Sequence, residues 1–284
     1  MLSISMAACA KDPEPAAVTV TGTVHPAPAT ALAPTTTAPS WRSQVLAEHE
    51  VNPAYRQGLA TDPGTQGWVL STNNGLWRTD GMFQGHSAPS DKADLIIPAQ
   101  LAQQGYNHVG DIDITGDVLW APIEKDDKDS GQQVIARFDA ATFRFIDSFV
   151  VPQHHASFVT VSPDLTVCST DGFDDDTILR YRFTGSALEP IEPVHMSRKI
   201  ERIQGGDLAG GALWISTDDE RNGLYRVDLD TGVVQSIGSM GYADGEGEGI
   251  DAQPSADGSV ALAALSIDAK LIPVRVISIS ATSR

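Results

Sequence analysis

The sequence predicts an all-β protein built as a five-bladed β-propeller, and three short recurring signatures carry this prediction. Each signature occurs five times within the 284 residues, always in the same order. Between them lie short alternating apolar strands, split by glycine, aspartate and asparagine turns and interrupted by no long helical period. Units of about 40–50 residues that repeat in this way are typical of propeller blades, which are four-stranded sheets packed around a channel.

The first signature is rich in glycine and marks the start of the innermost strand of each blade. It lies at residues 57–59, 108–110, 155–157, 204–206 and 248–250. The second is an apolar strand that ends in a polar residue, at 69–73, 120–124, 167–171, 214–218 and 264–268. The third is a short strand with an arginine, at Arg78, Arg137, Arg180, Arg226 and Arg275. A β-sandwich would explain the strands but not their ordered repetition, and a six-bladed propeller is the remaining alternative.

The two ends of the domain predict how the ring closes. Blade one is expected to have strands near 57–62, 67–72, 75–79 and 93–98. Blade five offers only three, near 249–254, 260–266 and 271–279. The segment 41–51 has no other place, so we expect it to supply the missing fourth strand and thereby remove an exposed sheet edge.

The first forty residues differ in composition from the rest. Residues 1–10 are predicted to be a signal-like segment, because Ala7-Ala8-Cys9 resembles the end of a bacterial lipoprotein signal and makes Cys9 the candidate lipidation site. Only eight residues precede Cys9 and none is basic, which departs from that pattern. Residues 11–40 are rich in Pro, Thr and Ala and predict a disordered tether, leaving 41–284 for the propeller. We therefore expect an extracytoplasmic protein, either a cell-envelope lipoprotein or a secreted one.

The charge balance restricts the partners. There are 19 Lys and Arg residues against 37 Asp and Glu residues, a net charge of −18. Nucleic acid binding requires a basic patch, so we expect no nucleic acid partner and contact with a membrane only through a lipid anchor. A monomer that takes a small molecule or a protein at its channel is the expectation. The acidity is explained equally well as a means of keeping the protein soluble.

In a propeller blade, the start of the first strand and the end of the second lie at the same end of the channel. The sequence therefore predicts five pairs of polar residues at one face: Gln57 with Asn73, His108 with Glu124, His155 with Asp171, Gln204 with Asp218, and Glu248 with Asp268. Neighbouring loops add Asp111, His154 and Glu246. Many carboxylates at one mouth repel each other, and a divalent cation would relieve that repulsion.

These residues receive candidate roles by chemical type. Carboxylate and amide oxygens suit Ca²⁺, which is favoured, and two imidazoles among them make Zn²⁺ and Mn²⁺ the alternatives. The candidate metal ligands are Glu248, Glu124, Asp171, Asp218, Asp268 and Asn73. The candidate ligand-binding residues are Gln57, Asp111, His154, Gln204 and Glu246. His108 and His155 are the candidate acid–base residues. The competing interpretation is structural: loop aspartates form turns, and glycines fit a crowded channel.

Glu248-Gly249-Ile250 carries a family resemblance. It is similar to the Glu-Gly-Ile/Pro type motif of bacterial secreted propellers, specifically the calcium-dependent lactonase-like and phytase-like propellers. In those families an acidic residue of this motif on an inner strand helps to hold a metal in the channel. His108-Val109-Gly110-Asp111 and His155 depart from the pattern.

Two functions follow from these observations. The first is an extracytoplasmic binding module whose acidic mouth takes a cation and a small ligand or a protein, and the tether and the absence of known catalytic sequence motifs favour it. The second is a metal-dependent hydrolase of a lactone, phosphoester or similar ester, in which His108 or His155 moves a proton.

Overall fold

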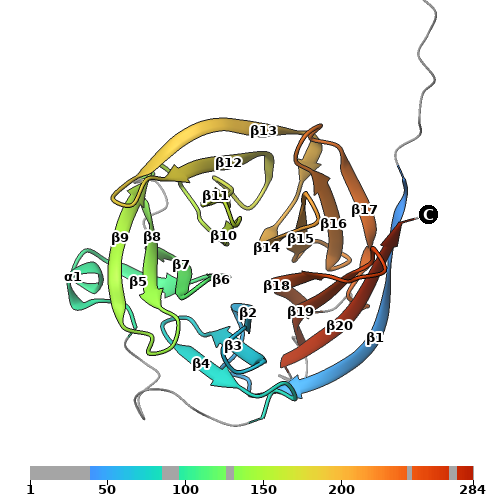
Figure 1. The fold of residues 1–284 in the computed structure, drawn as a ribbon, viewed down its shortest axis with the longest axis horizontal. Coiled ribbons are helices and arrows are strands. Elements are labelled where there is room, and N and C mark those ends of the chain that lie inside the picture. The colour runs from blue at the N-terminus through green and yellow to red at the C-terminus, as the bar shows by residue number, and fades with distance from the viewer. Residues whose placement is uncertain (1–38, 85–95, 126–130, 242–244, 269–273, 284) are drawn as a thin grey trace, which may run out of the picture. The chain divides into compact units, whose positions relative to one another are not determined.

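Five small antiparallel sheets are arranged in a ring (Figure 1). The structure is a computed structural model that describes residues 39–84, 96–125, 131–241, 245–268 and 274–283. Each sheet follows its predecessor along the chain and presents its first strand to the centre, which is the arrangement of a five-bladed β-propeller. The predicted fold class and blade number are confirmed.

Blades 1 and 2 occupy the first half of the ring. Blade 1 contains β2 (Gly58–Asp62), β3 (Gly67–Ser71) and β4 (Leu76–Thr79). Of its expected outer strand, residues 93–95 lie outside the described residues and 96–98 form no strand. Blade 2 contains β5 (Tyr106–Val109), β6 (Asp113–Thr115), β7 (Val118–Lys125), β8 (Gln133–Asp139) and β9 (Phe145–Val151). A four-residue helix, α1 (Ala99–Ala102), precedes it. No helix in the described ranges is long and apolar enough to cross a membrane.

Blades 3, 4 and 5 complete the ring. Blade 3 contains β10 (Thr160–Val161), β11 (Thr166–Ser169), β12 (Asp175–Phe183) and β13 (Leu188–Ile200). Blade 4 contains β14 (Ile203–Ala209), β15 (Ala212–Thr217), β16 (Gly223–Asp228) and β17 (Val234–Ser239). Blade 5 contains β18 (Gly245–Pro254), β19 (Val260–Asp268), β20 (Val274–Ser283) and β1 (Trp41–Val51).

The N-terminal strand closes the ring, as the sequence predicts. β1 pairs antiparallel with β20 in a register that runs from Trp41 opposite Ser283 to Val51 opposite Val274, with a bulge near Val45. In Figure 1 the blue β1 therefore lies beside the red β20, at the outside of blade 5. The first and last described strands share one sheet, so β20 is not left as an unpaired edge.

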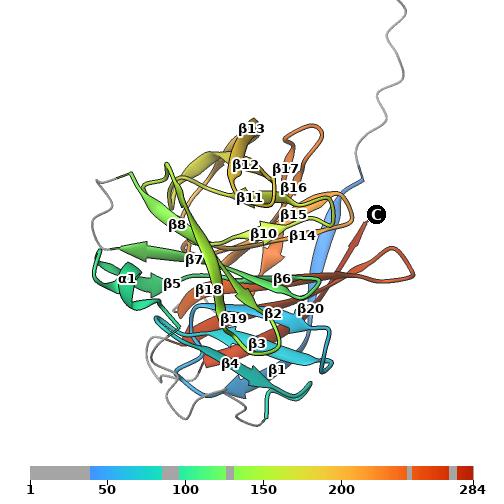
Figure 2. The same cartoon turned by 60° about the vertical axis from the view of Figure 1, so that its left-hand side comes forward.

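Apolar side chains fill the spaces between neighbouring blades. Val69 of blade 1 packs in one cluster with Leu119 of blade 2, and Trp214 of blade 4 packs in another with Leu262 of blade 5. These side chains come from the faces of the sheets, because alternate residues of a strand point to opposite faces. The burial of these apolar side chains between the blades is the main hydrophobic contribution to stability. The first strands, in contrast, bring polar groups to the centre of the ring. Figure 2 shows the sheets from the side.

Candidate functional site

The inner strands begin, and the second strands end, at one end of the ring, which we call the mouth. His108 lies directly opposite Glu124 in the β5–β7 pair. His155 N–H donates to the carbonyl of Asp171 at 3.1 Å. The other three expected pairs sit on the matching ends of β2–β3, β14–β15 and β18–β19. The members of the first four pairs are therefore neighbours, whereas Asp268 lies opposite Gly245 and so stands three residues away from Glu248 in the register. The side chains of these residues gather in separate groups.

The first group, the acidic cluster, consists of Asp218, Glu246 and Glu248. Glu248 is 7% exposed and Asp218 is 6% exposed, while Glu246 lies at the surface. Burial raises the pKa of Glu248 well above its ordinary value, and the charges of Glu246 and Asp218 raise it further. Burial also raises the pKa of Asp218 to about 6, even though Arg202 opposes the rise. The cluster thus holds negative charge where water solvates it poorly.

Two arginines flank the acidic cluster. Arg202 forms an ion pair with Asp218, and an Arg56 nitrogen lies 3.9 Å from a Glu246 oxygen. Both guanidinium groups remain accessible, because their side chains are 59% and 44% exposed. Within the described parts of the chain, the Glu248 carboxylate has neither a hydrogen bond nor an ion pair. Of the two buried acids of the cluster, Glu248 is therefore the one without a direct partner.

The second group, the histidine cluster, lies between blades 2 and 3. Glu124 Oε1 contacts His155 Nδ1 and accepts the Ala156 N–H at 2.5 Å. The side chains of Glu124 and His155 are 1% and 9% exposed. The Phe173 ring centre lies 3.6 Å from that of His155, so the imidazole is covered from one side. The carboxylate holds this imidazole in one orientation, beneath an aromatic ring.

His154 and Asp171 form a separate, exposed pair at the edge of the mouth. His154 Nδ1 lies 3.2 Å from Asp171 Oδ2, and the His154 N–H donates to Asp171 Oδ1 at 2.7 Å. Both side chains are well hydrated, so this contact is worth little to stability. The Asp171 carboxylate is therefore already bonded to a residue of its own blade.

Asp111 lies at the centre of the ring and joins the blades. Its carboxylate, 1% exposed, accepts four backbone hydrogen bonds. The donors are the N–H groups of Leu59, Ile112, Gly206 and Ile250, each 3.1 Å away. Its own N–H donates to the Ser157 carbonyl at 2.8 Å, which adds blade 3. Complete burial raises the pKa of Asp111, and the four donors oppose that rise. We call this arrangement the hub.

Glycines surround the hub because the strands approach too closely for side chains. A Cβ at Gly205 would lie 2.6 Å from Gly249 Cα and 2.7 Å from Asp111 Oδ2. A Cβ at Gly58 would lie 2.5 Å from Asp111 Cα. The channel is therefore filled at this level, and the structural interpretation of the glycine signature holds here. Asp111, expected to bind a ligand, has both oxygens engaged by the propeller itself.

A second acidic ring lies beyond the hub, two residues further along the inner strands. Asp113, Asp207 and Asp251 each accept an N–H from the next blade. The donors are Val161 at 2.6 Å, Ala252 at 2.6 Å and Thr61 at 3.1 Å. Burial raises the pKa of Asp113 to about 6, and the charge of Asp251 adds to this. Through these hydrogen bonds the three aspartates connect neighbouring blades, so their role is structural.

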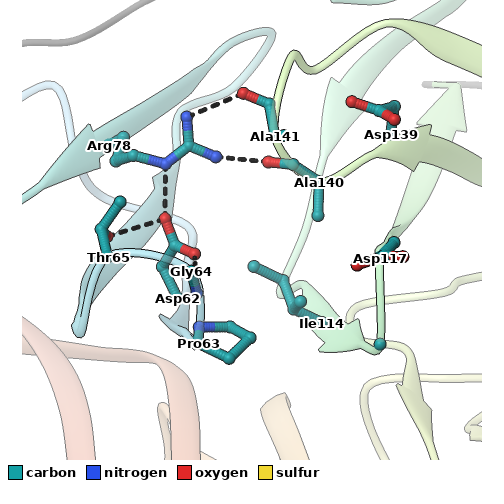
Figure 3. A pocket seen from close by; sticks show the side chains of 11 residues that line it. Asp62, Pro63, Gly64, Thr65, Arg78, Ile114, Asp117, Asp139, Ala140 and Ala141 are labelled. Atoms are coloured by element: carbon teal, nitrogen blue, oxygen red, sulfur yellow. Dashed lines mark hydrogen bonds and ion pairs between the residues drawn. The ribbon is translucent and has the colours of Figure 1, made fainter.

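A cavity lies elsewhere, between blades 1 and 2 at the end opposite the mouth (Figure 3). It has a volume of about 860 Å³ and contains none of the candidate site residues. On one wall, Arg78 Nε donates to Asp62 Oδ2 at 2.5 Å and Nη1 donates to the Ala141 carbonyl at 3.2 Å. Because Asp62 neutralises Arg78, this wall offers a ligand little uncompensated charge.

The remaining candidate residues are spread around the mouth. The backbone carbonyl of Asn73 accepts the Val109 N–H at 2.7 Å, and that of Gln57 accepts the Gly249 N–H at 3.0 Å. Asp268 Oδ2 lies 3.7 Å from Arg275 Nη1. Gln204 is half-buried beside the hub. In the part of the chain that the structure describes, no three His, Cys, Asp or Glu side chains converge as a complete metal-binding group.

Sequence reasoning missed Arg56, Arg202 and Phe173. The two arginines stand one or two positions before the glycine-rich signature of their blades, where the chain crosses the mouth, and that position was the available signal. Phe173 lies in a loop next to three aspartates, and nothing in its sequence context indicates that it covers His155.

Comparison with known proteins supports the fold and nothing finer. No protein-family model matches the chain, and no curated protein sequence does. Among solved structures, the major Malassezia sympodialis allergen Mala s 1 is 12% identical, with 85% of this chain and 83% of that chain covered and a TM-score of 0.50. Regucalcin from Agrobacterium tumefaciens, described as a calcium-binding protein, is 13% identical over 80% and 76% of the chains, with a TM-score of 0.49. A luciferin-regenerating enzyme is 13% identical over 78% and 74%, with a TM-score of 0.48.

Proposed function

We propose that this protein is an extracytoplasmic binding module whose mouth takes a divalent cation, with Ca²⁺ favoured, together with a small ligand or a protein. The observation that carries the proposal is Glu248, a carboxylate that is almost fully buried, has no direct partner among the described residues and lies beside two further acids. Its location outside the cytoplasm rests on Cys9 and the tether, which lie outside the described residues.

A buried carboxylate without a partner is unfavourable when ionised, so it either takes up a proton or binds a cation. The donors at the acidic cluster are oxygens, which Ca²⁺ prefers, and Ca²⁺ accepts amides, carbonyls and water as well as carboxylates. Glu248 and Asp218 would provide the charge; of the two nearby amides, Gln204 belongs to β14 and Gln57 directly precedes β2, the inner strands of the neighbouring blades. Both buried carboxylates fit this ion, and the remaining ligands would come from these amides and from water.

Calorimetry on the purified full-length chain tests this proposal. After treatment with a chelator, Ca²⁺ is expected to bind and to raise the melting temperature, because it binds the folded state alone. Glu248→Gln is expected to weaken the affinity by at least tenfold, corresponding to about 1.4 kcal/mol. Asp257→Asn is the matched control, since it removes one carboxylate from an exposed turn. If the chain binds no Ca²⁺, Glu248 is a protonated acid and the proposal is wrong.

The hydrolase alternative has one observation in its favour. The Glu124 carboxylate contacts Nδ1 of His155, as it would in an oriented general base. Phe173 covers the imidazole, however, and this favours binding over catalysis. A screen of lactones, phosphoesters and carboxyl esters, run with and without chelator, separates the two functions. Chelator-sensitive turnover that is lost in His155→Gln would establish the hydrolase.

A further inference from the structure

We propose that the mouth binds an oxyanion together with its cation, and that Arg56 and Arg202 provide the anion site. The inference rests on the cation proposed above and adds a ligand class to it. A carboxylate or phosphate group would lie over Glu248, between the two guanidinium groups. Binding of the cation and binding of the anion would then strengthen each other.

The charges of the acidic cluster give the first argument. When all three carboxylates are ionised, as cation binding requires, they and the two flanking guanidinium groups leave one net negative charge, which does not attract an anion. A divalent cation reverses this balance to one net positive charge. Because the site is partly shielded from water, such a reversal acts on a nearby anion more strongly than it would in bulk solvent. An anion with a single charge then neutralises the site.

The present partners of the arginines give the second argument. Arg202 pairs with Asp218, one of the two acids that would hold the cation, and Arg56 lies near Glu246, the third acid of the cluster. A bound cation competes for the Asp218 oxygens and so weakens their hold on Arg202, while Arg56 is held only by a long contact with Glu246, at 3.9 Å. Both side chains are roughly half-exposed, so they can turn without disturbing the core. A released guanidinium is well suited to an oxyanion, because it offers two parallel N–H donors.

The positions of the arginines give the third argument. Arg56 precedes β2 of blade 1 and Arg202 precedes β14 of blade 4, and these blades stand on either side of blade 5, which carries Glu248. The backbone of Arg202 is fixed, since its N–H donates to Asp174 Oδ1 at 3.0 Å and its carbonyl accepts the Asp218 N–H at 2.9 Å. One of the two guanidinium groups therefore projects from a fixed point at the rim.

The experiment measures the Ca²⁺ dissociation constant of the full-length chain by calorimetry in excess acetate and in chloride of equal ionic strength. Methylphosphonate replaces acetate in a second arm, which distinguishes a carboxylate from a phosphate-type ligand. Either oxyanion is expected to tighten Ca²⁺ binding by roughly fivefold or more, in the usual range of coupling between two ligands. By reciprocity, Ca²⁺ tightens oxyanion binding by the same factor.

The variants decide which residues carry the coupling. In Arg56→Gln/Arg202→Gln the ratio of the two dissociation constants is expected to fall to about one, and Arg202→Lys should retain only part of the coupling because lysine lacks the bidentate fork. Arg144→Gln, an exposed arginine of the β8–β9 turn at the opposite end, should retain the wild-type ratio. Absence of Ca²⁺ binding sinks the proposed function itself. Ca²⁺ binding that neither oxyanion tightens, or coupling that survives in the double variant, overturns this inference alone.

Discussion

Asp111 holds together more of the ring than any other described side chain. One carboxylate accepts backbone N–H groups from four blades, and the residue's own N–H reaches the fifth. Each carboxylate oxygen accepts two hydrogen bonds, so a side chain with a single acceptor oxygen cannot replace Asp111. At the residue scale, the centre of this propeller is therefore a structural carboxylate.

Asp111→Asn is expected to destabilise the protein strongly. The amide has one oxygen and one NH₂ group, so two of the four backbone N–H groups would face a donor. An unsatisfied buried polar group costs about 1–3 kcal/mol, which predicts a loss of roughly 2–6 kcal/mol in the free energy of unfolding. Urea unfolding at neutral pH measures it, with Asp257→Asn as the exposed control. A loss below about 0.5 kcal/mol would contradict the role of the hub.

The sequence indicates the hub only in part. The glycine signature is visible, and its structural interpretation correctly anticipates a crowded channel. The role of Asp111 is not visible, because it depends on the interruption of the inner strand of blade 2 between β5 and β6, which turns this side chain to the axis. In the sequence, Asp111 looks like one more acid of the mouth.

At the scale of the strands, arginines of the third signature are packed rather than exposed. The Arg137 side chain is 12% exposed and pairs with Asp147, and its guanidinium lies 4.1 Å from the ring centre of Phe183 in the next blade. The Arg226 guanidinium likewise lies beside the Trp41–Trp214 pair, 5.3 Å from the ring centre of Trp41 and 6.0 Å from that of Trp214. At these two positions the arginine of the signature packs against aromatic rings at the boundary between blades, which sequence patterning alone does not reveal.

Closure by β1 is predictable because it follows from counting strands. Blade 5 lacks a fourth strand in its own segment, and 41–51 has no other partner. The convergence of side chains at the mouth is harder to predict, because bulges between Gly247 and Ile250 and between Ile203 and Gly205 redirect side chains. The strand order thus predicts which residues share one end of the ring. The bulges determine which of their side chains come together in the acidic cluster.

Removal of residues 1–51 is expected to disrupt the propeller. It would expose the edge of β20 and remove the Trp41 ring, whose centre lies 5.0 Å from that of Trp214. Loss of the contacts of the partly buried Trp41 and the buried Val51 alone corresponds to about 3 kcal/mol or more. Gel filtration and urea unfolding should show aggregation or an earlier transition. Removal of residues 1–38 is the control and should leave the transition unchanged. Equal stability of both shortened chains would contradict closure by β1.

At the scale of the whole molecule, the buried acids set how stability depends on pH. Burial raises the pKa values of Asp113 and Asp218 to about 6 and that of Glu248 well above its ordinary value. A carboxyl group of this kind binds its proton more tightly in the folded chain than in the unfolded chain. Surface acids such as Asp228, whose pKa is lowered mainly by its hydrogen bond with Thr231, act in the opposite sense at lower pH.

The free energy of unfolding is therefore expected to fall as the pH rises from about 4 to about 6, because the folded state carries more protons than the unfolded state over that interval. Below about pH 4 it should fall again, as the acids with lowered pKa values become protonated. Acidification also reduces the net charge of −18 and with it the repulsion within the folded chain. Above pH 4 this stabilises the folded state on acidification, as the protonation of the buried acids does. Maximum stability is expected near pH 4–5, more acidic than for most proteins.

Asp113→Asn tests the origin of this profile. The substitution removes a buried group that titrates near pH 6 and keeps an oxygen that can accept the Val161 N–H. Urea unfolding of wild type and variant at about pH 5 and about pH 7 gives the difference in stability between the two conditions, which should shrink by roughly 1–3 kcal/mol in the variant. Asp257→Asn, on the surface, should leave that difference as it is. A wild-type protein that gains stability from pH 5 to pH 7 would show that the second acidic ring is ionised at little cost, held by its hydrogen bonds to the next blades.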